Sequence, residues 1–340
     1  LVLSQLGPVG RSPILFAVCF ALGFCLLALM VRTCPPDWSL RRVAFVVVLM
    51  GVMGRVGFLW FPVSNDVYRY IWEGYIQNHG FNPYQVAPND PLLKNLIGGD
   101  MATIWQQINH KDLTAAYPPL AMLLFRSLAA ISLSPIIFKM VMIGFDLVTI
   151  GVMILIVKWR KAAPENLFWY AANPLVLVYV AGEAHLDIVQ VAFLVIGLYG
   201  ISRKKAIPGF LSLGAAVASK YISIVALPFL MKRSNRYAWP MTVLAGFFFL
   251  PFAQDPGALF DSLVIFGSQM HYNDGLTEIL RTLLGASALP VLVLILFGLL
   301  AMIYLFVPDT MRSVYLALGA VLLCLPTLHP WYLLLVAPLM

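Results

Sequence analysis

The chain has 340 residues, of which 61% are hydrophobic and only 11% are charged. Soluble domains average about 45–50% apolar and about 25% charged residues, so this composition excludes a soluble enzyme, a disordered linker, a coiled coil and a free-standing nucleic-acid module. We therefore expect an integral membrane protein, and we interpret the net charge of +7 as basic loops facing anionic lipid rather than as a nucleic-acid surface.

The apolar stretches predict an all-α polytopic membrane protein. A helix needs about 20 apolar residues to cross a hydrocarbon core of about 30 Å. The stretches that qualify are roughly 13–32, 43–61, 136–157, 237–253, 287–307 and 313–326. Shorter runs, in which Pro119, Pro174, Pro208, Pro228 or charged residues intervene, suggest half-helices and re-entrant hairpins: 118–133, 166–181, 186–201, 206–218 and 221–231.

The distribution of charge predicts an orientation. Lys and Arg gather at 158–161, 203–205 and 232–236, and loops rich in these residues stay in the cytoplasm. The segment 62–117 has three basic and five acidic residues, a net charge of −2, and 254–285 has one basic and four acidic residues, a net charge of −3. We expect both segments to be external loops of a single transmembrane domain, 1–340, in a cytoplasmic membrane.

One stretch conflicts with this orientation. If 62–117 is outside and 158–161 is inside, an odd number of crossings must separate them, yet two apolar runs do, 118–133 and 136–157. Arg126 weakens the first run, so 118–133 is either a short helix that does not span fully or a true span that breaks the charge rule.

The external loop 62–117 opens with a group of polar residues directly after an apolar run. If this part is helical, spacings of three and four residues place Asp66, Arg69, Tyr70 and Glu73 on neighbouring faces. A carboxylate there suits a general base, because burial raises its proton affinity while a nearby arginine keeps it ionised. The alternative is a plain salt bridge at the membrane edge, in which Arg69 pairs with Asp66 or Glu73.

Two further motifs follow in the same loop. His-Gly-Phe-Asn-Pro-Tyr at 79–84 indicates a turn that presents Tyr84, and Tyr117-Pro118-Pro119-Leu120 closes the loop. An aromatic residue before two prolines is typical of an interfacial anchor and a helix start.

The order of these motifs resembles a known family. The series Asp66-Val-Tyr-Arg-Tyr-Ile-Trp-Glu-Gly, Gly80-Phe-Asn-Pro-Tyr84, Ile108-Asn-His110 and Tyr117-Pro-Pro-Leu120 is similar to the first external loop of GT-C-type glycosyltransferases, in the polyprenol-phosphate-mannose-dependent mannosyltransferase branch. Looser matches are Asn173-Pro174-Leu175 with Gly182-Glu-Ala-His-Leu-Asp187, Ser219-Lys220-Tyr221 with Pro228, and Thr327-Leu-His329-Pro-Trp-Tyr332. One departure is Glu73, where many relatives carry Asp.

The resemblance implies a GT-C-like bundle of about 10–12 transmembrane or re-entrant helices with a large first external loop. It also implies inverting transfer of a sugar, most simply mannose, from a polyprenyl-phosphate donor to a glycolipid or envelope glycan at the outer membrane face. Asp66 matches the family's catalytic aspartate, and we expect it to act as general base. Membrane lipids are expected partners, and nucleic acid is not.

The departing phosphate needs a cation, and Lys220 is the leading candidate because it interrupts an apolar run. The alternative is that Lys220 snorkels to the headgroups. We expect His329 to be a second catalytic group. The other residues predicted to bind substrate are Arg69, Tyr70, Glu73, Tyr84, Tyr117, His185, Asp187, Arg281 and Trp331. Aromatic rings that offer a stacking surface to sugars, or a simple interfacial anchor, are Trp72, Tyr84, Trp105 and Trp331.

We predict no metal or other cofactor. Glu183, His185 and Asp187 spread around a helix axis at spacings of two and four residues, so they do not converge on one ion. The four cysteines have no zinc-like or disulfide-like spacing. A competing function is a secondary transporter that uses Glu183, Asp187 and Lys220 as coupling charges, but a transporter has no need for the long outer loop rich in Trp, Tyr, Asn and Pro.

Overall fold

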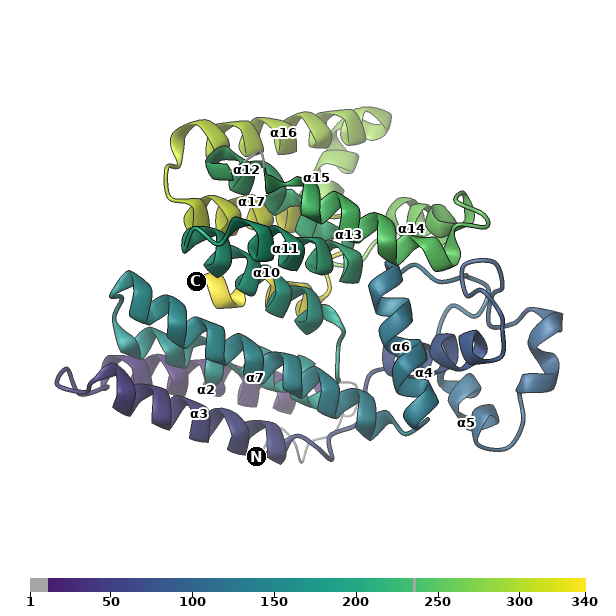
Figure 1. The fold of residues 1–340 in the computed structure, drawn as a ribbon, viewed down its shortest axis with the longest axis horizontal. Coiled ribbons are helices and arrows are strands. Elements are labelled where there is room, and N and C mark those ends of the chain that lie inside the picture. The colour runs from purple at the N-terminus through teal and green to yellow at the C-terminus, as the bar shows by residue number, and fades with distance from the viewer. Residues whose placement is uncertain (1–11, 235–236) are drawn as a thin grey trace.

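The computed structural model describes residues 12–234 and 237–340. Within these ranges the protein is built from helices, and its only strand-type pairing is an isolated bridge between Tyr272 and Thr327. The α-helices divide into two blocks and a smaller group at one end (Figure 1). The all-α prediction is therefore confirmed.

The first block contains three long helices, α2 (Pro13–Arg32), α3 (Leu40–Gly57) and α7 (Pro135–Arg160). Buried polar side chains join them. The Arg55 Nε lies 2.8 Å from Asp146 Oδ2, and the Tyr170 hydroxyl donates to the other oxygen of Asp146 at 2.8 Å. A buried ion pair resists separation because either partner alone would be an uncompensated charge. This cluster fixes α3 against α7 and against the short helix α8 (Phe168–Ala171).

The group at one end comes from the predicted external loop and the helix after it: α4 (Asn65–Asn78), α5 (Asp100–Gln107) and α6 (Pro119–Ile131). The helical spacing expected around Asp66 is confirmed by α4. Helix α6 has 13 residues, a length of about 20 Å. It is too short to cross a core of about 30 Å unaided, which favours the short-helix interpretation of 118–133.

The second block holds most of the remaining chain. Its helices are α10 (Asp187–Ser202), α11 (Ala206–Ser219), α12 (Leu227–Ser234), α13 (Trp239–Phe249), α16 (Ala288–Phe306) and α17 (Thr310–Cys324). The three-residue helix α9 (Pro174–Val176) packs against α2 of the first block. The predicted external segment 254–285 contains α14 (Ala258–Gln269) and α15 (Gly275–Leu284). Six-residue turns of tighter or wider helix lie at Leu177–Gly182, Tyr221–Ala226 and Pro330–Leu335.

The prolines begin helices rather than interrupt them, which corrects the expected positions of the breaks. Pro119 and Pro174 are the first residues of α6 and α9, and Pro208 and Pro228 lie in the first turns of α11 and α12. Proline is tolerated there because the first N–H groups of a helix have no intrahelical partner. The helices are interrupted at 183–186 and at Lys220, which are the gaps between the predicted apolar runs, and the backbone is extended at Lys220.

Among the residues that the structure describes, three runs are long and apolar enough to cross a membrane: Pro13–Arg32, Pro135–Arg160 and Gly275–Phe306. Their apolar surface is largely uncovered, and Leu294, Phe297 and Phe306 of α16 are 66–76% exposed. Such a surface is stable in lipid and not in water. These helices identify an integral membrane protein. The predicted span 43–61 is shifted, since α3 covers Leu40–Gly57 and includes Arg41, Arg42 and Arg55.

Candidate active site

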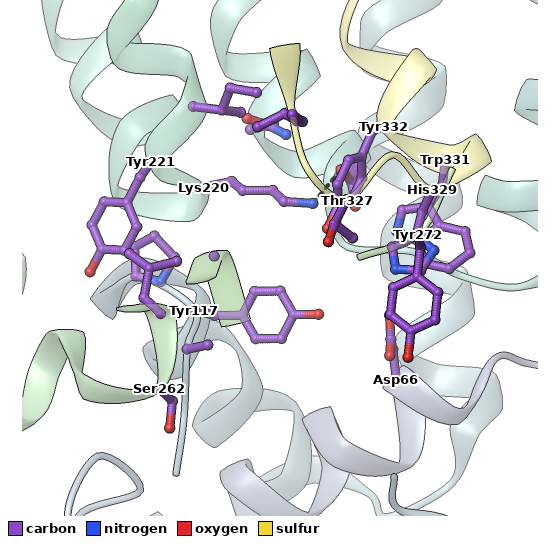
Figure 2. A pocket seen from close by; sticks show the side chains of 18 of the residues that line it. Asp66, Tyr117, Lys220, Tyr221, Ser262, Tyr272, Thr327, His329, Trp331 and Tyr332 are labelled. Atoms are coloured by element: carbon purple, nitrogen blue, oxygen red, sulfur yellow. Dashed lines mark hydrogen bonds and ion pairs between the residues drawn. The ribbon is translucent and has the colours of Figure 1, made fainter. Parts of the chain in front are cut away.

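A cavity of about 680 Å³ lies where the start of α4, the loop between α5 and α6, the start of α10, helix α14 and the segment after α17 meet. Its walls include Asp66, Tyr117, Asp187, Lys220, His329 and Tyr332. Figure 2 shows the Lys220 side chain extended into this space, with Asp66 beneath Tyr272 and His329 on another side. Residues far apart in the sequence, all six of them within the motifs above, therefore share one site.

Asp66 is the second residue of α4, and its side chain is 23% exposed. The helix N-terminus favours a negative charge there. Burial by itself raises the pKa of Asp66, but the interaction with His185 and the positive charges of His185 and Lys220 outweigh it and hold that pKa below its usual value. Asp66 is thus an ionised carboxylate at neutral pH, able to accept a proton.

His185 lies behind Asp66 in the linker 183–186 and is buried. Its Nδ1 is 3.4 Å from Asp66 Oδ2, and its Nε2 is 3.0 Å from Glu183 Oε2. Burial lowers the pKa of His185, but the two carboxylates outweigh this effect and raise it to about 9. The imidazole is therefore charged at neutral pH, and it does not line the cavity.

Trp331 is sandwiched between two histidines. The His185 ring stacks on the indole with centroids 3.9 Å apart, and the His329 ring stacks on it with centroids 4.4 Å apart. Both faces of Trp331 are thus covered, so neither is free for a sugar. Burial and the nearby cations lower the pKa of His329 despite Asp66, which favours a neutral ring at the cavity wall.

The ammonium group of Lys220 is the cation that lies closest to Asp187 in the cavity wall. It occupies the extended residue between α11 and the turn Tyr221–Ala226, with φ −158° and ψ 125°. Its Nζ lies 2.5 Å from Asp187 Oδ1 and 4.3 Å from the centre of the Tyr332 ring. The ammonium is thus paired within the cavity wall, where it can meet an anionic ligand.

Arg69 pairs with Glu73 at 2.8 Å, one of the two ion pairs considered for this arginine. Its Nη atoms donate to the backbone carbonyls of Asn109, His110, Leu113 and Thr114. These bonds and the one to Glu73 use all five N–H groups of the guanidinium. Arg69 therefore ties α4 to the loop 109–114 that borders the cavity. Burial raises the pKa of Glu73, although Arg69 opposes the shift.

Three predicted tyrosines are grouped beside Asp66. Tyr117 lines the cavity, and its hydroxyl is 3.4 Å from that of Tyr70. The Tyr84 hydroxyl donates to the carbonyl of Tyr117 at 2.5 Å. Burial raises the pKa of all three well above 10, so each hydroxyl is neutral. The Tyr84 and Trp72 rings are buried in the core, away from any ligand.

Arg281 is not brought to the cavity. It lies on α15, where its exposed side chain contacts Glu278 at 3.4 Å. Several residues that the motifs had not assigned to the site also line the cavity: Gln190, Tyr221, Ser262, Tyr272, Thr327 and Tyr332. Tyr332 could have been found, since it ends the His-Pro-Trp-Tyr motif. Ser262 and Tyr272 belong to no motif.

No group of three side chains that could hold a metal ion is present among residues 12–234 and 237–340. The side chains of Glu183, His185 and Asp187 belong to two separate ion pairs. Glu183 contacts His185, whereas Asp187 pairs with Lys220.

The chain was compared with known proteins. Residues 4–234 match the family model for the N-terminal domain of alpha-(1->6)-mannopyranosyltransferases. Two relatives named alpha-(1->6)-mannopyranosyltransferase A are similar. One, from Mycobacterium tuberculosis, is 25% identical over 176 residues, which are 49% of this chain and 32% of the relative. The other, from Corynebacterium glutamicum, is 25% identical over 179 residues, 50% of this chain and 34% of the relative. The matched regions thus span about a third of each relative. No solved structure is significantly similar to the chain.

Proposed function

Because the chain belongs to the alpha-(1->6)-mannopyranosyltransferase family, we propose that it transfers mannose from a polyprenyl-phosphate donor to a hydroxyl of a glycolipid or envelope glycan. The observation that carries this proposal is that an ionised carboxylate, Asp66, and a cation, Lys220, line one cavity. An α-(1→6) product implies a primary hydroxyl as acceptor, and an inverting reaction that forms an α-linkage starts from a β-linked donor.

The reaction forms one bond and breaks one. The acceptor oxygen bonds to the anomeric carbon of mannose as the bond from that carbon to the phosphate oxygen breaks on the opposite face. Asp66 takes the hydroxyl proton, and polyprenyl phosphate leaves with the bonding electrons. Lys220 stabilises the negative charge on the departing phosphate, having exchanged its contact with Asp187 for the phosphate. The neutral His329 orients the acceptor beside Asp66.

The remaining predicted residues support these groups in the proposal. Tyr117 and Asp187 line the cavity and contact the substrates directly. The pair of Arg69 and Glu73 holds the loop 109–114 in place. Tyr70 and Tyr84 hold Tyr117 in place. Trp331 orders the two histidines. Arg281 remains a candidate for a later contact with the lipid-linked donor at the membrane surface, although it lies outside the cavity.

The charge of the two ends of the molecule supports an outward-facing site. Arg160 at the end of α7 pairs with Asp309 before α17, and Lys232 of α12 donates to the Tyr304 carbonyl near the end of α16. These helix ends, with their basic residues, lie together. At the other end of α7, Lys139 donates to carbonyls that follow α3, including that of Leu59 at 3.1 Å, close to Asp66 in the chain. Since basic ends stay in the cytoplasm, the cavity opens on the outer face.

The decisive test is transfer in vitro. Purified protein in detergent is incubated with radiolabelled polyprenyl-phosphate mannose and a membrane glycolipid pool, and labelled products are identified. The wild-type protein should produce a mannosylated glycolipid. The Asp66→Asn variant should lose transfer while it still folds and binds donor, because the amide fills the same space without accepting a proton.

Two outcomes contradict the proposal. Retained turnover by Asp66→Asn removes Asp66 from the mechanism. Absence of any product with the wild-type protein, together with uptake of a labelled solute into proteoliposomes without lipid-linked sugar, favours transport by the charged pair of Lys220 and Asp187.

A further inference from the structure

The linker 183–186 connects the turn Leu177–Gly182 to α10 and holds one imidazole between two carboxylates. His185 Nδ1 faces Asp66 at 3.4 Å, and His185 Nε2 faces Glu183 at 3.0 Å. The Glu183 side chain is 14% exposed and is not part of the cavity wall. Glu183 therefore reaches Asp66 only through His185.

The linker is also attached to the start of α4, the helix that bears Asp66. The backbone N–H of Ser64 donates to the Glu183 carbonyl at 3.1 Å. On the other side, the backbone N–H of Leu186 lies 3.5 Å from the Tyr70 hydroxyl oxygen. Ala184 adopts the left-handed conformation with φ 62°, a strained choice for a residue with a Cβ. The surrounding contacts thus impose an unusual backbone that points His185 at Asp66.

Packing leaves the imidazole one orientation. Trp331 covers one face of the His185 ring at 3.9 Å, and the Tyr179 ring lies 6.0 Å away at an angle of 51°. Both ring nitrogens lie within 3.4 Å of a carboxylate oxygen, and a ring flipped by 180° would place carbon atoms there instead. The two carboxylates, rather than the shape of the surrounding pocket, stabilise a ring that carries a proton on each nitrogen.

We propose that Glu183 is a positioning residue, which through His185 holds the Asp66 carboxylate in its reactive orientation. The expected effect on kcat rests on the proposed function, whereas the expected orientation of the Asp66 carboxylate rests on the geometry of the linker. It assigns His185 a supporting role behind Asp66 in place of the substrate contact expected from the sequence.

The charged and titratable groups around His185 come from several elements. Asp66 faces it from α4, Glu183 from its own linker, and His329 from the segment after α17. Lys220, which follows α11, pairs with Asp187 at the start of α10, and Lys139 of α7 interacts electrostatically with Glu183. The two carboxylates that contact the ring dominate, because the other groups act at longer range or are already paired.

The test is the Glu183→Gln variant, whose amide oxygen still accepts a hydrogen bond from His185 but carries no charge. We expect kcat to fall by about 10- to 100-fold, by analogy with the loss of a hydrogen-bonded carboxylate partner from a metal-bound histidine, with little change in KM. The alkaline limb of the kcat profile should move to lower pH, because loss of one carboxylate lowers the pKa of His185 from about 9. Glu165→Gln, the same change at the basic end of the molecule, serves as the matched control.

A second readout does not depend on transfer. In protein labelled with ¹⁵N-histidine, the His185 resonance, assigned by its loss in His185→Gln, should titrate near pH 9 in the wild type and at lower pH in Glu183→Gln. An unchanged titration and an unchanged kcat profile in Glu183→Gln would overturn the proposal. If the wild-type protein transfers no mannose, the proposed function fails. The histidine titration alone then decides whether Glu183 raises the pKa of His185.

Discussion

At the scale of single residues, the site is a set of opposite charges held a few ångströms apart. Asp66 faces the imidazole of His185, and Lys220 faces Asp187. Each charge in such a pair is stabilised by its partner. The free energy gained when a substrate phosphate binds Lys220 must therefore offset the loss of the ion pair between Lys220 and Asp187. The cavity wall offers the Asp187 carboxylate no other cation at contact distance among the described residues.

Lys220→Ala should lower kcat/KM for the lipid-linked donor by about 10²- to 10³-fold, the usual cost of removing one group that stabilises a departing anion. Lys220→Arg should recover part of the loss, because it keeps the positive charge. The measurement is steady-state transfer at varied donor concentration. Lys94→Ala, which removes an exposed lysine of the outer loop, is the control, and equal kinetics in the two alanine variants would show that Lys220 does not meet the phosphate.

The sequence predicted the identity of the central residues better than their tasks. Motif order selected Asp66, Lys220 and His329, and all three line the cavity. The covered faces of Trp331 could not be foreseen, because the two rings that cover it lie at positions 185 and 329 and only tertiary packing brings them to one indole. The ion pair of Arg69 with Glu73 was one of the two predicted from spacing, whereas the backbone carbonyls that Arg69 also binds carry no sequence signal.

At the scale of elements, the position of Asp66 depends on how closely α4 packs on α6. A Cβ placed on Gly74 would lie 2.2 Å from the Phe125 carbonyl oxygen, so only glycine permits this approach. Helix type and approximate bounds followed from the apolar pattern. The breaks did not, because proline in a first helical turn looks in the sequence like proline in the middle of a helix.

Gly74→Ala should therefore lower stability by about 1–3 kcal/mol or more, the cost of overpacking a tight contact, and reduce transfer by displacing α4. Thermal unfolding in detergent measures the first effect. Gly144→Ala on α7 is the matched control, since a Cβ there meets nothing within 4 Å. That substitution should be neutral or stabilise by up to about 1 kcal/mol through helix propensity. Equal melting temperatures for the two variants would contradict the packing argument.

At the scale of the whole molecule, basic residues gather where α7 and α12 end, whereas Asp66 at the start of α4 and Asp187 at the start of α10 line the cavity. The distribution of charge along the chain predicts that the basic ends face the cytoplasm, because the translocation of basic loops is disfavoured. The apolar outer surface of α16 then sets the molecule within lipid. The number of full crossings was less accessible to sequence, since short helices such as α6 have the composition of a span without its length.

Cysteine labelling tests the orientation. In a protein whose native cysteines are replaced by serine, Asp112→Cys near the cavity should react with a membrane-impermeant maleimide added to intact cells. Lys204→Cys at the basic end should react only after the cells are opened. Both positions are exposed in the structure, so protection reports sidedness rather than burial. The reverse pattern would place the cavity in the cytoplasm and exclude a site at the outer face.

The stack of His185, Trp331 and His329 joins residues that are far apart in the order of synthesis. Ribosomes deliver residues 327–332 about 260 positions after Asp66. Asp66 and His185 are therefore synthesised long before the indole that stacks on the His185 ring. A chain that ends before residue 327 lacks both Trp331 and His329, so we expect it to leave one face of the His185 ring uncovered.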